Sequence, residues 1–336
     1  MHVEPWVWGL TLGLAVAFLV FDVFYIGRSP HEPTMGESAR HLAFFIGGAA
    51  VFAIGVFVIS GSTYGAQFVG GWLTEYSLSV DNLFVFLIIM TKLRVPRQLQ
   101  QSALLVGIVL ALVLRGLFIA AGAAAINAFS WVFYLFGAFL VYTAARLARG
   151  DDSDSDEYTE SRAVRWIRRR VPSTTEYRGA HLTTRQGGRR LATPMMIVIV
   201  ALGTTDVLFA LDSIPAIYGI TQEPYLVLTA NLFALMGLRQ LYFLIGGLLE
   251  RLVYLSLGLS VLLGFIGVKL ILHALHENEL PFINGGEPVH SAPDVPIWLS
   301  LVVIVGILSI TVVASLVKSR RDNRGAERDQ LSSSRR

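Results

Sequence analysis

The sequence predicts an all-α polytopic membrane protein with about nine transmembrane helices. Apolar residues make up 54% of the chain and charged residues only 15%, whereas an ordinary soluble domain has about 25% charged residues. The apolar residues gather in long runs, which excludes a soluble globular enzyme and a disordered chain. The runs do not alternate with polar residues, and this argues against a membrane β-barrel.

Nine apolar runs are long enough to be transmembrane helices, which need about 20 residues each. No basic residue precedes the first run and no small-residue cleavage site follows it, so we expect a retained span rather than a signal peptide. The predicted spans are 6–26, 41–60, 70–91, 101–122, 129–147, 194–219, 225–248, 252–273 and 296–317.

Basic residues outside the spans fall only in alternate connections, after the first, third, fifth, seventh and ninth spans. By the positive-inside rule, this pattern predicts an N-terminus outside the cell and a cytoplasmic C-terminus. The net charge of +3 therefore reflects cytoplasmic loops, and no nucleic-acid partner is expected.

The connections divide the chain into six parts. We predict spans one to five in 1–147, a charged cytoplasmic linker in 148–193, spans six to eight in 194–273, an acidic external loop in 274–295, span nine in 296–317 and a disordered basic cytoplasmic tail in 318–336. The linker is either simply solvated or contacts anionic lipid through its arginine cluster. The external loop is either simply solvated or concentrates cations near an entrance.

Two spans carry pairs of carboxylates inside the membrane. Span three contains Glu75 and Asp81, and span six contains Asp206 and Asp212. Each buried charge costs roughly 2.5–3.5 kcal/mol, so such residues usually serve a function. A spacing of six residues means about 9 Å of rise and about 120° of rotation along a helix. The two acids of one span therefore do not share a face.

Spans 3–5 and 6–8 resemble two copies of one three-helix unit. LRGLFIAAG at 114–122 matches LRQLYFLIG at 238–246, which places Arg115 and Arg239 equally deep. FLVYTA in span five matches FIGVKL in span eight. Because the charge pattern directs span three inward and span six outward, the copies are predicted to be inverted. Inverted repeats are typical of secondary transporters, whose sites lie near the midplane.

The charged groups inside the spans are predicted to bind a cation. Five acids face three bases, so two negative charges remain if all are ionised, and one divalent cation or two protons would balance them. The basic residues either balance charge or act as structural locks for two acids. The charged residues in the spans are Asp22, Glu75, Asp81, Asp206, Asp212, Arg115, Arg239 and Lys269.

The donors available in the spans are oxygen atoms. They come from carboxylates, hydroxyls, the Asn82 amide and backbone carbonyls, and the chain has no cysteine. Pro215 deprives the Leu211 carbonyl of its helical partner, which produces either an ordinary kink or a broken helix with a carbonyl beside Asp212. Oxygen sites suit Mn²⁺, Mg²⁺ or Ca²⁺ and disfavour copper and structural zinc.

Four segments of the chain resemble motifs of the TerC/Alx family of integral membrane proteins. They are EYSLSVDNLFVF, DVLFALDSIPAIYGIT, NLFALMGLRQLYF and FIGVKL, within about 70–275. The resemblance implies a role in metal-ion homeostasis, with manganese export as the expected activity. The metal-binding residues that it implies are Glu75, Asp81, Asn82, Asp206, Asp212 and Ser213, with Asp22 where relatives also tend to carry an acid.

Two functions are consistent with these observations. The first is a secondary transporter that exports a divalent cation, Mn²⁺ before Ca²⁺ or Mg²⁺, with protons as the coupling ion. It would be a multi-pass protein of a prokaryotic plasma membrane, with no prosthetic group and no enzymatic activity. The alternative is a membrane accessory factor that binds metal and supplies it to partner proteins, which the sequence does not identify.

Overall fold

A computed structural model describes most of the chain. The backbone is described for residues 3–28, 34–129, 131–149, 174, 177, 179–186, 189–245, 254–278, 280–281, 283–289, 292–293 and 295–333. Within these ranges the side chains are described except at 15, 18–28, 81, 84, 127, 186, 189–190, 245 and 320–333.

The described elements are almost entirely helical. They are α1 (Pro5–Arg28), α2 (Met35–Ser60), α3 (Ser62–Lys92), α4 (Arg97–Ala128), α5 (Val132–Ala148), β1 (Thr183–Gln186), β2 (Arg189–Ala192), α7 (Pro194–Tyr218), α8 (Pro224–Met236), α9 (Leu238–Ile245), α10 (Leu255–His276), the short 3₁₀ helix η3 (Asn284–Gly286) and α11 (Ile297–Ser333). Each predicted span coincides with a helix, or with the pair α8 and α9. In this part of the chain seven helical segments are long and apolar enough to cross a membrane, and α5 is a shorter apolar helix. The predicted all-α polytopic class is confirmed.

Local sequence explains where several helices begin. The Thr34 hydroxyl caps α2 by accepting a hydrogen bond from the backbone N–H of Glu37 at 3.2 Å. Proline stands in the first turn of α7 and of α8, at Pro194 and Pro224. Proline suits that turn because its missing N–H would have no helical partner there.

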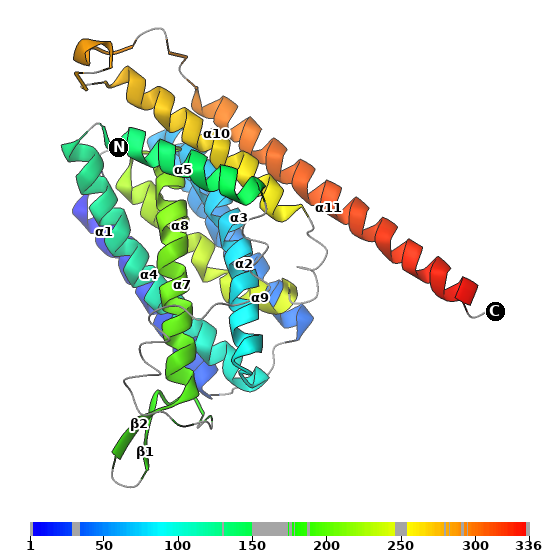
Figure 1. Ribbon diagram of the computed structural model, residues 1–336. Coiled ribbons are helices and arrows are strands. Elements are labelled where there is room, and N and C mark those ends of the chain that lie inside the picture. The colour runs from blue at the N-terminus through cyan, green and yellow to red at the C-terminus, as the bar shows by residue number, and fades with distance from the viewer. Residues whose placement is uncertain are drawn as a thin grey trace.

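The helices form a bundle around α3. This helix packs against α2, α7, α8 and α11, while α4 packs against α7 and α8. In Figure 1, α5, α10 and α11 run obliquely across the bundle, and α5 lies along α10. The β1–β2 hairpin and the loop that joins α10 to α11 lie at opposite ends of the molecule (Figure 1).

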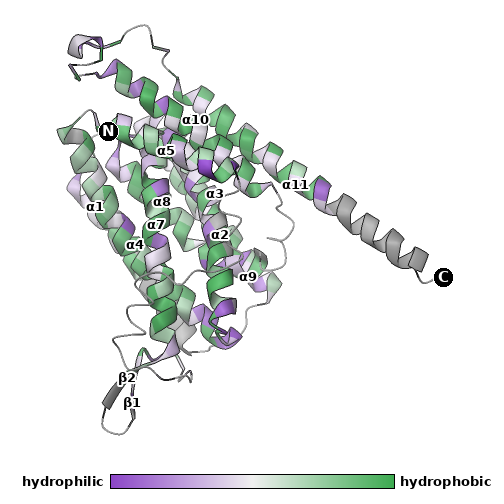
Figure 2. Ribbon diagram, in the orientation of Figure 1, coloured by the Kyte–Doolittle hydropathy of each residue, from purple (hydrophilic) through white to green (hydrophobic). Residues whose placement is uncertain are grey.

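The distribution of side chains is that of a protein in lipid. Large apolar side chains face outward, including Val58 and Ile59, which are 79% and 86% exposed. Figure 2 shows hydrophobic residues along most of the length of the helices. Polar and charged side chains are buried instead, among them Glu75, Arg115 and Asp206. A soluble protein would not leave so many large apolar groups in contact with water.

α5 and α10 approach each other closely through two glycines. A Cβ atom on Gly137 would lie 2.8 Å from the carbonyl oxygen of Gly267, and a Cβ on Gly267 would lie 2.9 Å from that of Gly137. Membrane helices often use small residues in this way to bring two backbones together. The crossing therefore depends on the absence of a side chain at both positions.

The helix breaks differ from those suggested by the sequence. α7 continues through Pro215, so the broken-helix interpretation of that proline is wrong. The predicted span 225–248 is instead divided at Gly237, between α8 and α9. A Cβ on Gly237 would lie 3.2 Å from Leu42 and 3.8 Å from Tyr76. Glycine is a poor helix former, and here it also lets α2 and α3 lie close to the chain.

One prediction outside the spans needs correction, and the linker contains a regular element. α11 continues to Ser333, so the segment predicted to be a disordered tail is helical there. The linker contains an antiparallel hairpin in which Thr183 pairs with Ala192. Before the hairpin, the Tyr177 hydroxyl donates a 2.8 Å hydrogen bond to the Leu93 carbonyl at the end of α3. Residues 150–173, 175–176, 178 and 187–188 of the predicted linker lie outside the described residues.

Candidate functional site

A buried arginine joins the acids of two different helices. Arg115 lies near the middle of α4 and is 1% exposed. Glu75 on α3 and Asp206 on α7 are also buried and form salt bridges with it. The three residues come from helices that pack together in the interior of the bundle.

The guanidinium of Arg115 binds Asp206 with two nitrogens. Nη2 donates to Oδ1 at 3.1 Å and Nε donates to Oδ2 at 3.3 Å. This paired arrangement is the strong geometry for an arginine and a carboxylate. The remaining nitrogen, Nη1, donates to Oε1 of Glu75. Arg115 therefore contacts both Asp206 oxygens and one Glu75 oxygen.

Two neutral side chains complete the set around Arg115. Its Nη1 lies 3.3 Å from the Ser213 hydroxyl oxygen and 3.2 Å from the Asn231 amide oxygen. Both residues are buried, on α7 and α8. Five oxygen atoms from three helices thus point at one cationic group.

Several polar atoms beside this cluster have no hydrogen-bond partner among the described residues. They are Oε2 of Glu75, Oγ1 of Thr74, Oγ of Ser79 and Nδ2 of Asn231. Thr74 and Ser79 are on α3 with Glu75, and α3 packs against α8, which carries Asn231. Buried polar atoms without partners are costly, so this side of the cluster can accept a polar or charged ligand.

Asp212 contacts a different helix from Asp206. It is half-buried on α7, and its Oδ1 accepts a 3.2 Å hydrogen bond from the Thr143 hydroxyl of α5. The sequence predicted that Asp206 and Asp212 do not share a face of the helix, and in the structure Asp206 binds Arg115 of α4 whereas Asp212 binds Thr143 of α5. Asn82 is buried on α3.

The remaining predicted site residues fall into two groups. The basic residues Arg239 and Lys269 lie on α9 and α10. The side chains of Asp81 and Asp22 lie outside the described residues. Among the side chains that are described, no three His, Cys, Asp or Glu groups are close enough to hold a metal ion. A cation here would therefore need neutral oxygen donors as well as the two carboxylates.

Sequence reasoning did not single out Asn231. Its contact with Arg115 depends on how α8 is rotated toward α4, which a sequence pattern does not reveal. The sequence feature that could have identified Asn231 is its polar amide inside an apolar span, at the first position of the motif NLFALMGLRQLYF.

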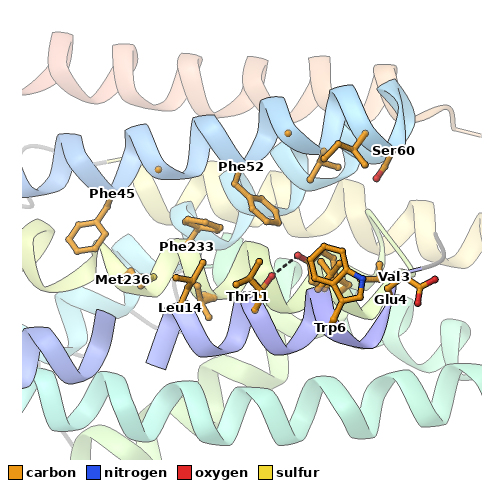
Figure 3. A pocket seen from close by; sticks show the side chains of 18 of the residues that line it. Val3, Glu4, Trp6, Thr11, Leu14, Phe45, Phe52, Ser60, Phe233 and Met236 are labelled. Atoms are coloured by element: carbon orange, nitrogen blue, oxygen red, sulfur yellow. Dashed lines mark hydrogen bonds between the residues drawn. The ribbon is translucent and has the colours of Figure 1, made fainter. Parts of the chain in front are cut away.

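A cavity of about 740 Å³ lies between α1, α2 and α8. Figure 3 shows the rings of Phe45, Phe52 and Phe233 at this cavity. Thr11 and Tyr225 both line the cavity, and their hydroxyls are joined by a 2.8 Å hydrogen bond, drawn as a dashed line from Thr11 in Figure 3. The walls are largely apolar, so this cavity offers few oxygen donors for a cation.

Comparison with known proteins agrees with the sequence motifs and the fold. Residues 60–323, which include all the helices of the Arg115 cluster, match the model of the integral membrane protein TerC family. The chain belongs to the TerC family. The resemblance predicted from the four motifs is confirmed.

Relatives extend over nearly the whole TerC-family chain. Membrane protein Rv2723 of Mycobacterium tuberculosis is 47% identical over 317 residues, which are 94% of this chain and 80% of the relative. Membrane protein STKORF319 of Myxococcus xanthus is 38% identical over 317 residues, 94% of each chain. The "Putative membrane-bound redox modulator Alx" of Salmonella typhi is 35% identical over 330 residues, 95% of this chain and 97% of Alx. No solved structure matches the chain.

Proposed function

We propose that this TerC-family protein is a secondary transporter that exports a divalent metal cation, with Mn²⁺ as the favoured substrate and protons as the coupling ion. The observation that carries the proposal is the buried set of oxygen donors on α3, α7 and α8. Glu75, Asp206, Ser213 and Asn231 all bind one positive group, Arg115. Four side chains that hold a guanidinium through oxygen also suit a hard metal cation.

The chemistry of these donors supports the choice of ion. Carboxylate, hydroxyl and amide oxygens are the ligands of Mn²⁺, Mg²⁺ and Ca²⁺. The chain has no cysteine, so a soft thiolate site is excluded. The absence of thiols also means that any redox role suggested by the name Alx would need chemistry other than disulfide exchange. Mn²⁺ is preferred to Ca²⁺ and Mg²⁺ because the sequence motifs resemble those of manganese exporters.

The pairing of helices supports a repeat of two three-helix units. The first helix of one unit packs against the second of the other, in both directions: α3 against α8, and α4 against α7. The third helices, α5 and α10, pack against each other. A two-fold relation between spans 3–5 and 6–8 would produce this pattern. In such transporters the substrate site lies near the midplane between the repeats, as the Arg115 cluster lies between α3 and α7.

Flux measurements test the proposal directly. Purified protein in liposomes should move Mn²⁺ across the bilayer, and Glu75→Gln or Asp206→Asn should abolish this flux because each removes a carboxylate from the site. The matched control is Glu4→Gln, since Glu4 is exposed just before α1 and lies outside both the Arg115 cluster and the acidic external loop. Wild-type flux in both site variants would remove the site assignment. Absence of flux in the wild type, with a stoichiometric partner co-purified from cells, would favour the accessory factor instead.

Proton coupling requires a separate measurement. Metal ligands must lose their protons to bind, so Mn²⁺ binding should release protons and the apparent affinity should rise with pH. Calorimetry in buffers of different ionisation enthalpy counts the protons released. No release between pH 6 and 8, with Mn²⁺ still bound, would contradict antiport while leaving metal transport possible by another coupling.

A further inference from the structure

Arg115 occupies the position in the polar interior that a bound cation would need. Resting on the proposed function, we infer that Arg115 is a built-in competitor of the substrate cation. Its guanidinium holds the same oxygens that would bind the metal, and it must leave them before the metal can bind. The residue thereby lowers the resting affinity of the site and favours release of the ion.

The contact geometry makes the two states mutually exclusive. Arg115 nitrogens lie 3.1 Å and 3.3 Å from the Asp206 oxygens, and another nitrogen bonds Glu75. Divalent metals bind oxygens at roughly 2.0–2.6 Å. An ion held at that distance by both carboxylates would overlap the guanidinium. Metal and Arg115 cannot share these oxygens at the same time.

Electrostatics explains why a competitor is useful. Two buried carboxylates with no counter-charge would repel each other and would pay a large desolvation cost. Arg115 supplies one positive charge, and arginine remains charged at any physiological pH. The site therefore contains a permanent internal cation against which an external one must compete.

The unpaired atoms beside Arg115 give the incoming ion an advantage. Oε2 of Glu75 and the hydroxyl of Ser79 are buried and without a hydrogen-bond partner among the described residues. Arg115 does not use either atom. A metal ion that bound Glu75 through both oxygens would use Oε2, a ligand atom that the guanidinium does not contact. This difference lets a divalent ion displace a group that already makes five contacts.

The competing interpretation is that Arg115 is a permanent lock between α3, α4 and α7. Both interpretations predict that loss of Arg115 lowers thermal stability. They differ in the metal affinity of the variant. A lock that is removed leaves metal binding unchanged or weaker, whereas a competitor that is removed leaves it stronger.

The test is Mn²⁺ titration calorimetry on the purified full-length protein in detergent at pH 8, where protons compete least. Arg115→Gln should lower the Kd by about tenfold, within the usual range for coupled sites. Arg115→Lys keeps the charge but cannot bind two carboxylates through a planar fork, so its Kd should fall less. The control is Arg149→Gln, because Arg149 is exposed at the end of α5. Its Kd should equal that of the wild type.

A second readout covers a variant that folds poorly. Mn²⁺ should raise the Tm of Arg115→Gln and Arg115→Lys more than that of the wild type, because tighter binding stabilises the folded state further. Folded variants with unchanged or weaker Mn²⁺ binding would overturn the inference while wild-type flux kept the proposed function. Mn²⁺ binding by the variants alone would support the inference. No Mn²⁺ binding in any protein would overturn both.

Discussion

Arg115 shows how one side chain can set both the stability and the chemistry of a membrane interior. It takes part in five hydrogen bonds that join α3, α4, α7 and α8. A charge in this position would be costly alone, but its two carboxylate partners offset much of that cost. The same contacts place two acids from different helices close enough to share a cation.

Removing one acid should therefore destabilise the fold. Asp206→Asn leaves the buried Arg115 with one carboxylate instead of two, and breaking a buried pair costs about 3 kcal/mol. We expect the Tm in detergent to fall by about 5 °C or more. Glu287→Gln removes a negative charge from an exposed side chain and should leave the Tm unchanged. Equal Tm values for the two variants would show that the Arg115–Asp206 pair adds no stability.

The acids could be predicted from the sequence, but their partners only in part. Glu75, Asp206 and Arg115 were identified because charged residues are rare in apolar spans. That Arg115 binds both acids, and that Asn231 joins them, depends on the rotation of each helix in the bundle. Asp212 has the same composition signal as Asp206 but contacts Thr143 instead.

At the scale of the helices, the length of the apolar runs predicts where helices lie, but the positions of the glycines do not predict where helices break or cross. The nine apolar runs coincide with helices because an apolar run of this length matches the number of helical residues needed to cross the hydrocarbon core of the membrane. The break at Gly237 could not be predicted, since many membrane helices contain glycine without breaking. The close approach of Leu42 and Tyr76 to Gly237 is likewise a property of the assembled bundle. The same holds for the glycine crossing of α5 and α10.

That crossing allows a test of helix packing. Gly137→Ala or Gly267→Ala would place a methyl group less than 3 Å from the opposite backbone carbonyl. The helices must then separate, and we expect a lower Tm and lower yield of folded protein. In Gly306→Ala the new methyl group would meet nothing within 4 Å. That control should be neutral or slightly stabilising, because alanine is the better helix former. A Tm for Gly267→Ala as high as that of Gly306→Ala would contradict the packing argument.

At the scale of the whole molecule, the Arg115 cluster lies between two chemically different ends. The hairpin that follows the arginine-rich stretch is at one end, and the acidic loop between α10 and α11 is at the other (Figure 1). Transport from the cytoplasm requires that these ends face opposite sides of the membrane. The distribution of basic residues predicts that the hairpin is cytoplasmic.

Cysteine labelling would test this orientation, because the chain has no cysteine of its own. Arg185→Cys would place one thiol in the hairpin and Glu287→Cys one in the loop after α10, both at exposed positions. Three candidate spans separate them, Pro194–Tyr218, Pro224–Leu244 and Leu255–His276. An odd number of crossings puts the two thiols on opposite sides. A membrane-impermeant maleimide should therefore label Glu287→Cys in intact cells and Arg185→Cys only after permeabilisation. The reverse result would mean that the orientation is inverted. Labelling of both thiols from outside would mean that one of the three segments does not cross the bilayer. All three segments belong to the predicted second repeat.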